Sequence, residues 1–150
     1  SLTSVTIPDG VTSIGDRAFW GCSSLTSITI PDSVTSIGHC AFEGCSSLTS
    51  VTILDSVTNI GDSAFNWCSS LKEVCISDLA NWCGIEFGNA SANPLCCAHN
   101  LYLNNGLGAY ELVTDLVIPD SVTEIGNSAF YNCTSLTSVT IPDSVKSRGK

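Results

Sequence analysis

The amino-acid sequence predicts a repeat solenoid, a rod of stacked coils with one coil for about every 23 residues. The first observation is the segment Ser-Leu-Thr-Ser-Val-Thr-Ile-Pro-Asp, which occupies 1–9 and returns nearly unchanged at 24–32 and 47–55. The second is the block Val-Thr-x-Ile-Gly-x-x-Ala-Phe-x-x-Cys, which recurs at 11–22, 34–45, 57–68 and 122–133. A unit of this size cannot bury its apolar face alone, whereas stacked units can.

Each coil begins with a short strand. In the first copy Val5 and Ile7 alternate with small hydroxyl residues, which is the period of a strand with one buried face. Pro8 and Asp9 then end the strand, because Pro has no N–H for the ladder and Asp favours turns. Weaker copies of this strand occupy 70–78, 112–120 and 135–143.

The second half of each coil is predicted to contain a short helical turn. Gly15 precedes this turn, and Asp16 can cap it. Ala18, Phe19 and Cys22 are spaced to share one face, which would point toward the core. The prediction is therefore a parallel sheet on one face of the solenoid, with short helical turns opposite.

The repeat is interrupted by a variant unit. We expect one solenoid domain over 1–150, with regular repeats at 1–76 and 112–145 and the variant unit at 77–111. Ser77 can cap a short helix that Gly84 ends. The sequence Asn-Asn-Gly-Leu-Gly-Ala-Tyr at 104–110 then joins two strand-like segments, 101–103 and 111–118, and this arrangement predicts a β-hairpin. Because the chain has no Met, we interpret it as part of a longer protein.

Composition excludes several classes of function. Lys and Arg total 5 against 14 Asp and Glu, and three of the five cations lie in the last five residues. Phosphate recognition needs clustered cations, so nucleic acid and anionic membrane surfaces are poor partners. No apolar run reaches the roughly 20 residues of a membrane span. The sequence contains no nucleophile motif, phosphate-binding loop or metal-ligand helix, so we expect neither enzyme activity nor a cofactor or metal.

The repeated signature resembles the BspA-like leucine-rich repeats, also called treponemal-type leucine-rich repeats. It reads Leu-x-x-Val-x-Ile-Pro, then Val-x-x-Ile-Gly-x-x-Ala-Phe-x-x-Cys, then Leu again. Segment 77–111 also looks like a variant unit that recurs in this family. The resemblance implies a right-handed solenoid on a large cell-surface or secreted protein, and adhesion to host matrix proteins or other cells. It implies no catalytic residues.

The first candidate site is the outward side of the strands. In leucine-rich repeat proteins this is the concave face and the usual binding surface, so the resemblance implies that it contacts a protein partner. The alternative is a solvated sheet face made of good β-formers. A hydroxyl array could also bind ice, although Glu73 and Cys75 interrupt the array. The predicted ladder consists of Ser4, Thr6, Ser27, Thr29, Ser50, Thr52, Glu73, Ser138 and Thr140.

The second candidate site is the loop of the predicted hairpin. Aromatic residues on loops are typical of recognition surfaces. The predicted contact residues are Asn105, Leu107 and Tyr110. Trp82 and Phe87 also lie in the variant unit, where we expect them to fill the gap left by the irregular coil.

A row of aspartates follows the strands. Stacked carboxylates can hold Ca²⁺, but one carboxylate in each coil is few for a site that needs several hard oxygen ligands. We favour a turn residue that bonds its own backbone. The row comprises Asp9, Asp32, Asp55, Asp78, Asp120 and Asp143.

The nine cysteines fall into several groups. The repeated ones, Cys22, Cys45, Cys68 and Cys133, are predicted to pack in the core. Cys40 and Cys75 are predicted to face outward. Cys96, Cys97 and His99 could bind zinc, but the spacing matches no standard motif, and packing is favoured. A disulfide from Cys83 to Cys96 or Cys97 is an alternative in a secreted protein.

Together these observations predict a non-catalytic protein-binding module, part of a surface adhesin. The first alternative is a structural spacer that holds other domains away from a cell surface, and the second is an ice-binding solenoid. Open edge strands invite edge-to-edge pairing, so self-association through the solenoid ends is also expected.

Overall fold

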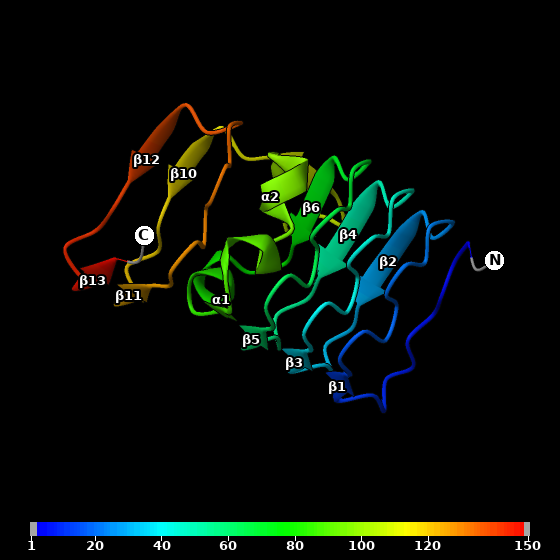
Figure 1. Ribbon diagram of the computed structural model, residues 1–150. Helices are drawn as coiled ribbons and strands as arrows, with labels where there is room; N and C mark the ends of the chain where they lie inside the picture. The colour runs from blue at the N-terminus through cyan, green and yellow to red at the C-terminus, as the bar shows by residue number, and fades with distance from the viewer. Residues whose placement is uncertain (1–2, 149–150) are drawn as a thin grey trace.

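The computed structural model describes residues 3–148 and shows a solenoid whose coils stack along one axis (Figure 1). In the regular coils the parallel registers pair residues that are 23 positions apart, such as Ser27 with Ser50 and Ser50 with Glu73, and at the variant unit the separation rises to 27, as for Val74 with Leu101. The predicted fold class and coil length are therefore confirmed. Within the described residues, no helix is long and apolar enough to cross a membrane.

The main sheet has five strands in the order β2-β4-β6-β8-β9. The first four strands are parallel, and β9 is antiparallel to β8. Ile28, Val51 and Val74 occupy one register column and are all buried, so each coil adds one layer to the core. The strands are β2 (Ser27–Ile30), β4 (Ser50–Ile53), β6 (Glu73–Ile76), β8 (Leu101–Asn104) and β9 (Tyr110–Leu112).

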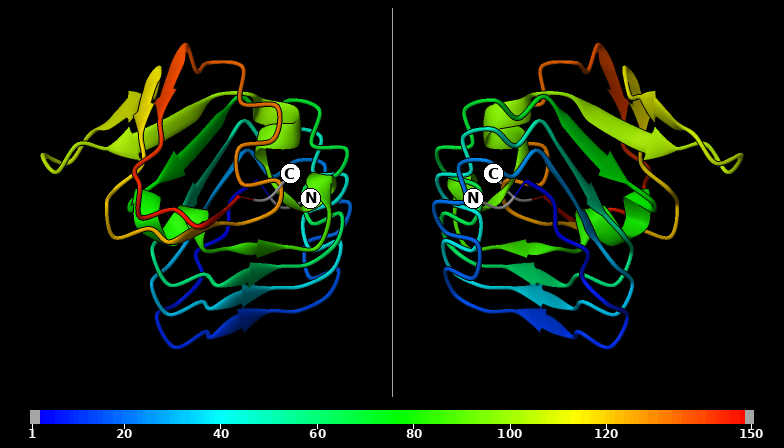
Figure 2. Two further views of the ribbon diagram at one scale, coloured as in Figure 1. Left: turned by 90° about the vertical axis from the view of Figure 1, so that its left-hand side faces the viewer. Right: turned by 90° about the vertical axis from the view of Figure 1, so that its right-hand side faces the viewer.

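A second parallel sheet lies on another side of the coil, in the order β1-β3-β5-β7 (Figures 1 and 2). The sequence gives no sign of this sheet, because a strand of two residues is too short to leave an alternating pattern. The second residue of each strand is buried, which is why the repeat has an apolar residue there. The strands are β1 (Ser13–Ile14), β3 (Ser36–Ile37), β5 (Asn59–Ile60) and β7 (Glu86–Phe87).

The predicted short helical turns are instead successive β-turns. Arg17, Cys40, Ser63 and Ser128 have φ between 55° and 64°. A residue in this left-handed region cannot continue a right-handed helix. The chain here bonds to the next coil, since the Phe19 N–H donates to the Ala41 carbonyl at 2.8 Å.

Asp16 and the glycine of the repeat fix the spacing between coils. Asp16 Oδ1 accepts a hydrogen bond from the backbone N–H of His39 at 2.8 Å, so it caps the following coil rather than its own turn. A Cβ on Gly61 would lie 2.6 Å from the His39 backbone nitrogen. Only glycine fits at that distance, which explains its place in the repeat.

Aromatic stacking organises the core of the regular coils. The rings of Phe19 and Phe42, and those of Phe42 and Phe65, lie 5.2 Å apart between centroids and nearly parallel. In the variant unit Trp82 is buried and meets Phe87 edge to face at 5.4 Å, as the expected gap-filling role requires.

The variant unit contains the helical segments found among the described residues, which are α1 (Leu79–Cys83), η1 (Ala90–Ala92) and α2 (Leu95–Ala98). The cap of α1 is Asp78, whose carboxylate accepts from the Asn81 N–H at 3.2 Å. The predicted cap, Ser77, is wrong, because its hydroxyl is buried without a hydrogen-bond partner. Gly84 follows α1 as predicted.

Two separate two-stranded parallel sheets complete the solenoid. One pairs β10 (Asp115–Val117) with β12 (Ser138–Thr140), and the other pairs β11 (Glu124–Ile125) with β13 (Ser147–Arg148). The predicted hairpin is present as β8 and β9, but its second arm ends at Leu112 and not at Ile118. The main sheet is thus interrupted between β9 and β10.

Candidate functional site

The outer face of the main sheet presents the predicted ladder. Along β2 the exposed residues Ser27 and Thr29 alternate with the buried Ile28 and Ile30. The ladder continues through Ser50 and Thr52, which are half-buried, to the exposed Glu73. The period-2 pattern therefore assigned the two faces of these strands correctly.

The second column of this ladder ends at a buried thiol. Cys75 pairs in register with Thr52 on one side and Tyr102 on the other, and only 7% of its surface is exposed. The prediction that Cys75 faces solvent is wrong, because its larger neighbours enclose an outward position. Burial raises the pKa of this thiol.

The remaining ladder residues lie apart from the main sheet. Ser4 forms a single bridge with Ser27, and Thr6 follows it outside any strand; both are exposed. Ser138 and Thr140 are exposed on β12, beyond the interruption. The structure therefore does not unite the predicted ladder in one continuous surface.

The hairpin projects from the body of the solenoid (Figure 2). The Asn105 side chain organises its tip: Oδ1 accepts from the Leu107 N–H at 2.8 Å, and Nδ2 donates to Glu111 Oε2 at 2.7 Å. Leu107 is 89% exposed, whereas Tyr110 is half-buried. Of the three predicted loop residues, Asn105 is thus engaged within the loop and Leu107 is the most available to a partner.

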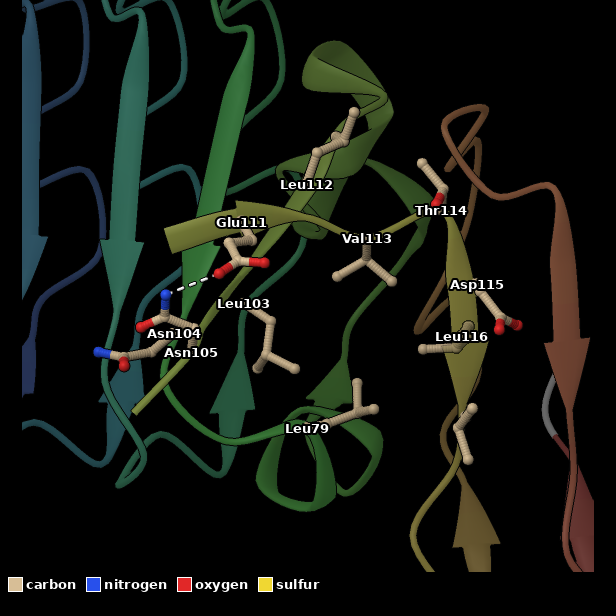
Figure 3. Close-up of a pocket in the computed structure, with 11 residues that line it drawn as sticks. Leu79, Leu103, Asn104, Asn105, Glu111, Leu112, Val113, Thr114, Asp115 and Leu116 are labelled. Atoms are coloured by element: carbon tan, nitrogen blue, oxygen red, sulfur yellow. Dashed lines mark hydrogen bonds between the residues drawn. The ribbon is translucent and has the colours of Figure 1, made fainter. Parts of the chain in front are cut away.

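A groove of about 350 Å³ lies where the main sheet is interrupted (Figure 3). Leu79 of α1, Leu103 of β8 and Leu116 of β10 give it apolar walls. Glu111 and Asp115 line it as well, and both are exposed. Sequence reasoning missed the groove, since its only trace was the 42-residue interval between the repeats that begin at 70 and 112.

Exposed aromatic residues gather on the turns between coils. Trp20 is 58% exposed, and its Nε1–H donates to Glu43 Oε1 at 3.2 Å. Trp67 is 72% exposed and has φ of 63° at the position that is Gly21, Gly44 and Asn132 in the other coils. Cys40, predicted to be exposed, is buried instead, and its thiol lies 3.7 Å from Glu43 Oε2.

The repeated cysteines form a column along the core. The Cys45 thiol donates to the Phe19 carbonyl at 3.3 Å, and the Cys68 thiol donates to the Phe42 carbonyl at 3.2 Å. Burial raises the pKa of Cys45 to about 11 and raises that of Cys68 further. These thiols therefore pack and bond as neutral groups, and all nine cysteines of the chain are free.

The variant unit adds Cys97 to this column, beside a neighbouring thiol. The Cys97 thiol lies 3.5 Å from the Phe65 carbonyl, and the two sulfur atoms of Cys96 and Cys97 are 3.6 Å apart. The hydrogen bond from Cys96 lowers the pKa of Cys97. His99 Nδ1 donates to the Asn132 carbonyl at 3.1 Å. Within residues 3–148 no three metal-ligating side chains are grouped so that they could hold a metal ion.

The aspartate row is stacked on the surface of the regular coils. A partial loss of solvent contact, together with the carboxylates of Asp55 and Asp9, raises the pKa of Asp32. Both effects disfavour the ionised form of Asp32 in the folded protein. Among the described residues, no group of three side chains could hold a metal ion.

Comparison with known proteins supports the repeat assignment. The model of the BspA type leucine-rich repeat region matches residues 1–90 and 108–150 in six copies. The unmatched segment contains α2, β8 and most of the hairpin loop. No curated protein matches the chain.

Solved structures of leucine-rich repeat proteins are similar to the chain. A leucine-rich repeat protein from Bacteroides ovatus is 34% identical with a TM-score of 0.54, over 93% of this chain and 31% of its own. The T. pallidum leucine-rich repeat protein is 25% identical with a TM-score of 0.51, over 98% and 69%. A leucine-rich cell surface protein from Faecalibacterium prausnitzii is 30% identical with a TM-score of 0.50, over 98% and 38%. The chain therefore spans less than half the length of the first and third of these proteins.

Proposed function

This chain belongs to the BspA-type leucine-rich repeat family, and we propose that it is a non-catalytic protein-binding module of a surface adhesin that contacts host matrix proteins or other cells. Leucine-rich repeat proteins generally serve in protein interaction or as structural elements. A cell-surface or extracellular location belongs to the same proposal. It is supported by the relative from Faecalibacterium prausnitzii, which is described as a cell surface protein.

The observation that carries this proposal is the outer face of the main sheet. Its strands hold Ser27, Ser50 and Glu73 in one register column and Thr29 and Thr52 in the next. Buried residues alternate with them, so the backbone beneath the face is fixed by the core. A fixed face contacts a partner without the entropy cost of ordering a flexible loop.

The hairpin tip supplies a second contact in this proposal. Leu107 is the most exposed large apolar side chain among the described residues. Its backbone is held by Asn105, so the loop presents it in a defined position. An apolar residue in such a position is suited to enter a pocket on a partner.

A structural spacer is the alternative function. The stacked rings of Phe19, Phe42 and Phe65 and the bonds between successive coils favour a stiff rod, which is what a spacer requires. Ice binding is the weakest alternative, because the hydroxyl columns give way to Glu73 and Cys75.

The test is a binding assay on immobilised fibronectin and fibrinogen at physiological salt. The variant Thr29→Tyr/Thr52→Tyr places two large side chains on the outer face while keeping good β-formers there. We expect saturable binding by the wild-type protein and at least a tenfold weaker affinity for this variant. The matched control is Thr123→Tyr/Thr134→Tyr, at two exposed threonines away from the proposed surfaces.

Each other outcome revises the proposal in a defined way. Binding that survives in the outer-face variant but is lost in Leu107→Ser would assign recognition to the hairpin. Wild-type protein that is folded by circular dichroism and binds neither ligand nor cells would favour the spacer. Thermal hysteresis in cooled solutions would favour the ice-binding alternative.

A further inference from the structure

We propose that the groove between β9 and β10 is a strand-addition site for an extended peptide segment of a partner protein, with apolar side chains facing inward and a Lys or Arg facing outward. The inference rests on the proposed function in taking the partner to be a protein. It assigns the contact, however, to a surface other than the outer face of the main sheet.

The first argument is the free edge of β10. The Ile118 N–H donates to the Thr140 carbonyl at 3.0 Å, and the Ser138 N–H donates to the Thr114 carbonyl at 3.3 Å. The even-numbered residues of this segment therefore bond to β12. The N–H and C=O groups of Asp115 and Val117 point to the opposite edge, where β10 has no partner strand among the described residues. Such an edge is a template for another strand.

The second argument is that the described part of this chain does not fill that edge. In a continuous solenoid a neighbouring parallel strand would lie beside β10. Here β9 pairs with β8 instead, and only Val113 and Thr114 separate it from β10. Figure 3 shows β9 crossing above the groove while β10 runs down one side of it, so β9 does not supply the missing strand.

The third argument is the apolar wall beside this edge. The side chain of Leu116 points inward from β10 and is 1% exposed. Leu79 and Leu103 lie across the groove from it, and Val113 lines its upper part (Figure 3). In an added strand, the residue beside Leu116 would also point inward and would bury its apolar surface here.

The fourth argument is charge. The Asp115 carboxylate accepts a hydrogen bond from Ser138 Oγ, and Glu111 accepts one from the Asn105 amide. Both donors are neutral, so two negative charges remain at the mouth of the groove. The residue of an added strand beside Asp115 would point outward, as Asp115 does, and a Lys or Arg there would face the Asp115 carboxylate across the edge.

The test uses the full chain and the peptide acetyl-Thr-Val-Lys-Val-Lys-Val-Thr-amide, labelled for fluorescence polarisation. Val117→Pro removes an N–H from the free edge and leaves the β10–β12 ladder intact, since Pro is tolerated on edge strands. Val139→Pro is the matched control. Val139 is similarly exposed on β12, and its N–H points away from β10 by the same alternation.

We expect the wild-type and Val139→Pro proteins to bind the peptide equally, and Val117→Pro to bind at least tenfold more weakly. Asp115→Lys tests the charge without touching the backbone. It should weaken binding of the Lys peptide at least tenfold and improve binding of a peptide with Glu in place of Lys. Equal affinity of the Val117→Pro and Val139→Pro proteins, or no binding by the wild-type protein, would overturn the inference.

Two further measurements identify the occupant of the edge and separate the groove from the outer face. If sedimentation equilibrium shows a wild-type dimer that Val117→Pro abolishes, the occupant is a second copy of the chain and the peptide proposal is wrong. The matrix-protein assay is scored independently. Absence of peptide binding with matrix binding intact overturns only the groove, and the reverse result overturns only the adhesin proposal.

Discussion

Successive coils are joined by different sets of hydrogen bonds in the regular coils and across the interruption. In the regular coils the backbone makes the connection, as when the Phe42 N–H donates to the Ala64 carbonyl at 2.8 Å. Across the interruption a backbone bond of this kind remains, from the Gly126 N–H to the Cys83 carbonyl at 2.8 Å, and buried side chains add further bonds. Trp82 Nε1 donates to the Ala129 carbonyl at 2.7 Å, and Asn93 Nδ2 donates to the Ser128 and Ala129 carbonyls at 2.6 and 3.0 Å.

This difference shows how the repeat pairs backbone groups between coils, and which groups must be paired in another way where the repeat is lost. Where the 23-residue register holds, every coil presents its N–H and C=O groups to the next. Where the register is lost, the carbonyls of the final coil still need donors, because an unpaired buried polar group is costly. Asn93, which is completely buried, has no counterpart in the regular coils.

The largest effect that can test this comparison is the loss of a stacked ring. Phe42→Ala should destabilise the protein by about 3–5 kcal/mol, because the ring is fully buried between two others. Urea unfolding followed by circular dichroism measures the change. Phe130→Ala, which truncates a half-buried ring beyond the interruption, should cost less, and Ser50→Ala on the outer face should stay within about 0.5 kcal/mol. Equal stabilities of Phe42→Ala and Ser50→Ala would contradict the assignment of faces.

The next effect concerns the side-chain connection. Asn93→Leu keeps the volume but leaves the Ser128 carbonyl and the Leu95 N–H without their amide partner, at a cost of about 1–3 kcal/mol. The same unfolding experiment applies. Asn66→Ala is the matched control, because the Asn66 amide contacts Glu43 at the surface and its loss should cost under about 0.5 kcal/mol. A neutral Asn93→Leu would show that the final coil does not depend on this connection.

The reactivity of the cysteines in the column also differs between the regular coils and the variant unit. At pH 7 iodoacetamide should alkylate Cys97 at least ten times faster than Cys45, because the thiolate is the reactive form. The lowered pKa of Cys97 favours its thiolate at neutral pH, whereas a pKa of about 11 keeps Cys45 protonated. Peptide mapping by mass spectrometry identifies the modified residue. Cys96→Ala should slow the reaction of Cys97 by removing the hydrogen-bond donor, and an unchanged rate would refute that cause.

The smallest effect concerns the aspartate row of the regular coils. The raised pKa of Asp32 means that the fold disfavours its ionised form, so this group reduces stability at neutral pH and the penalty is relieved as pH falls toward that pKa. Asp32→Asn should therefore raise Tm slightly at pH 7. The gain should shrink in 1 M NaCl and at acidic pH. A larger gain in high salt would contradict repulsion as the cause.

Much of the fold could be predicted because its signals are local and repeated. The alternation of Val5 and Ile7 with hydroxyl residues recurs in β2 and β4, so the two faces of these strands follow from it. The role of a single residue was harder to predict where two neighbouring residues were both suited to it. Ser77 and Asp78 are both good helix caps, and burial of Ser77 left the role to Asp78.

The candidate sites were predictable only in part. The outward positions of β2 and β4 and the exposure of Leu107 follow from the pattern and the loop composition. Cys40 and Cys75 show where the sequence pattern fails. Both occupy positions that the pattern assigns to the outward face, and both are buried in the structure. Nothing local distinguishes these two thiols from exposed ones.

The sequence by itself determined the solenoid, the length of its coils and the inward column of apolar residues. Each repeat has the same pattern of apolar and turn residues, so equivalent residues of successive coils stack on one another every 23 positions. Only the tertiary structure decided where that stacking stops. The hairpin pairs β9 with β8, so β10 begins a new sheet and its edge remains free beside Leu79 and Leu103 within the described residues. The position of a strand that leaves the register depends on contacts between distant segments, such as Trp82 with Ala129, and no local pattern encodes them.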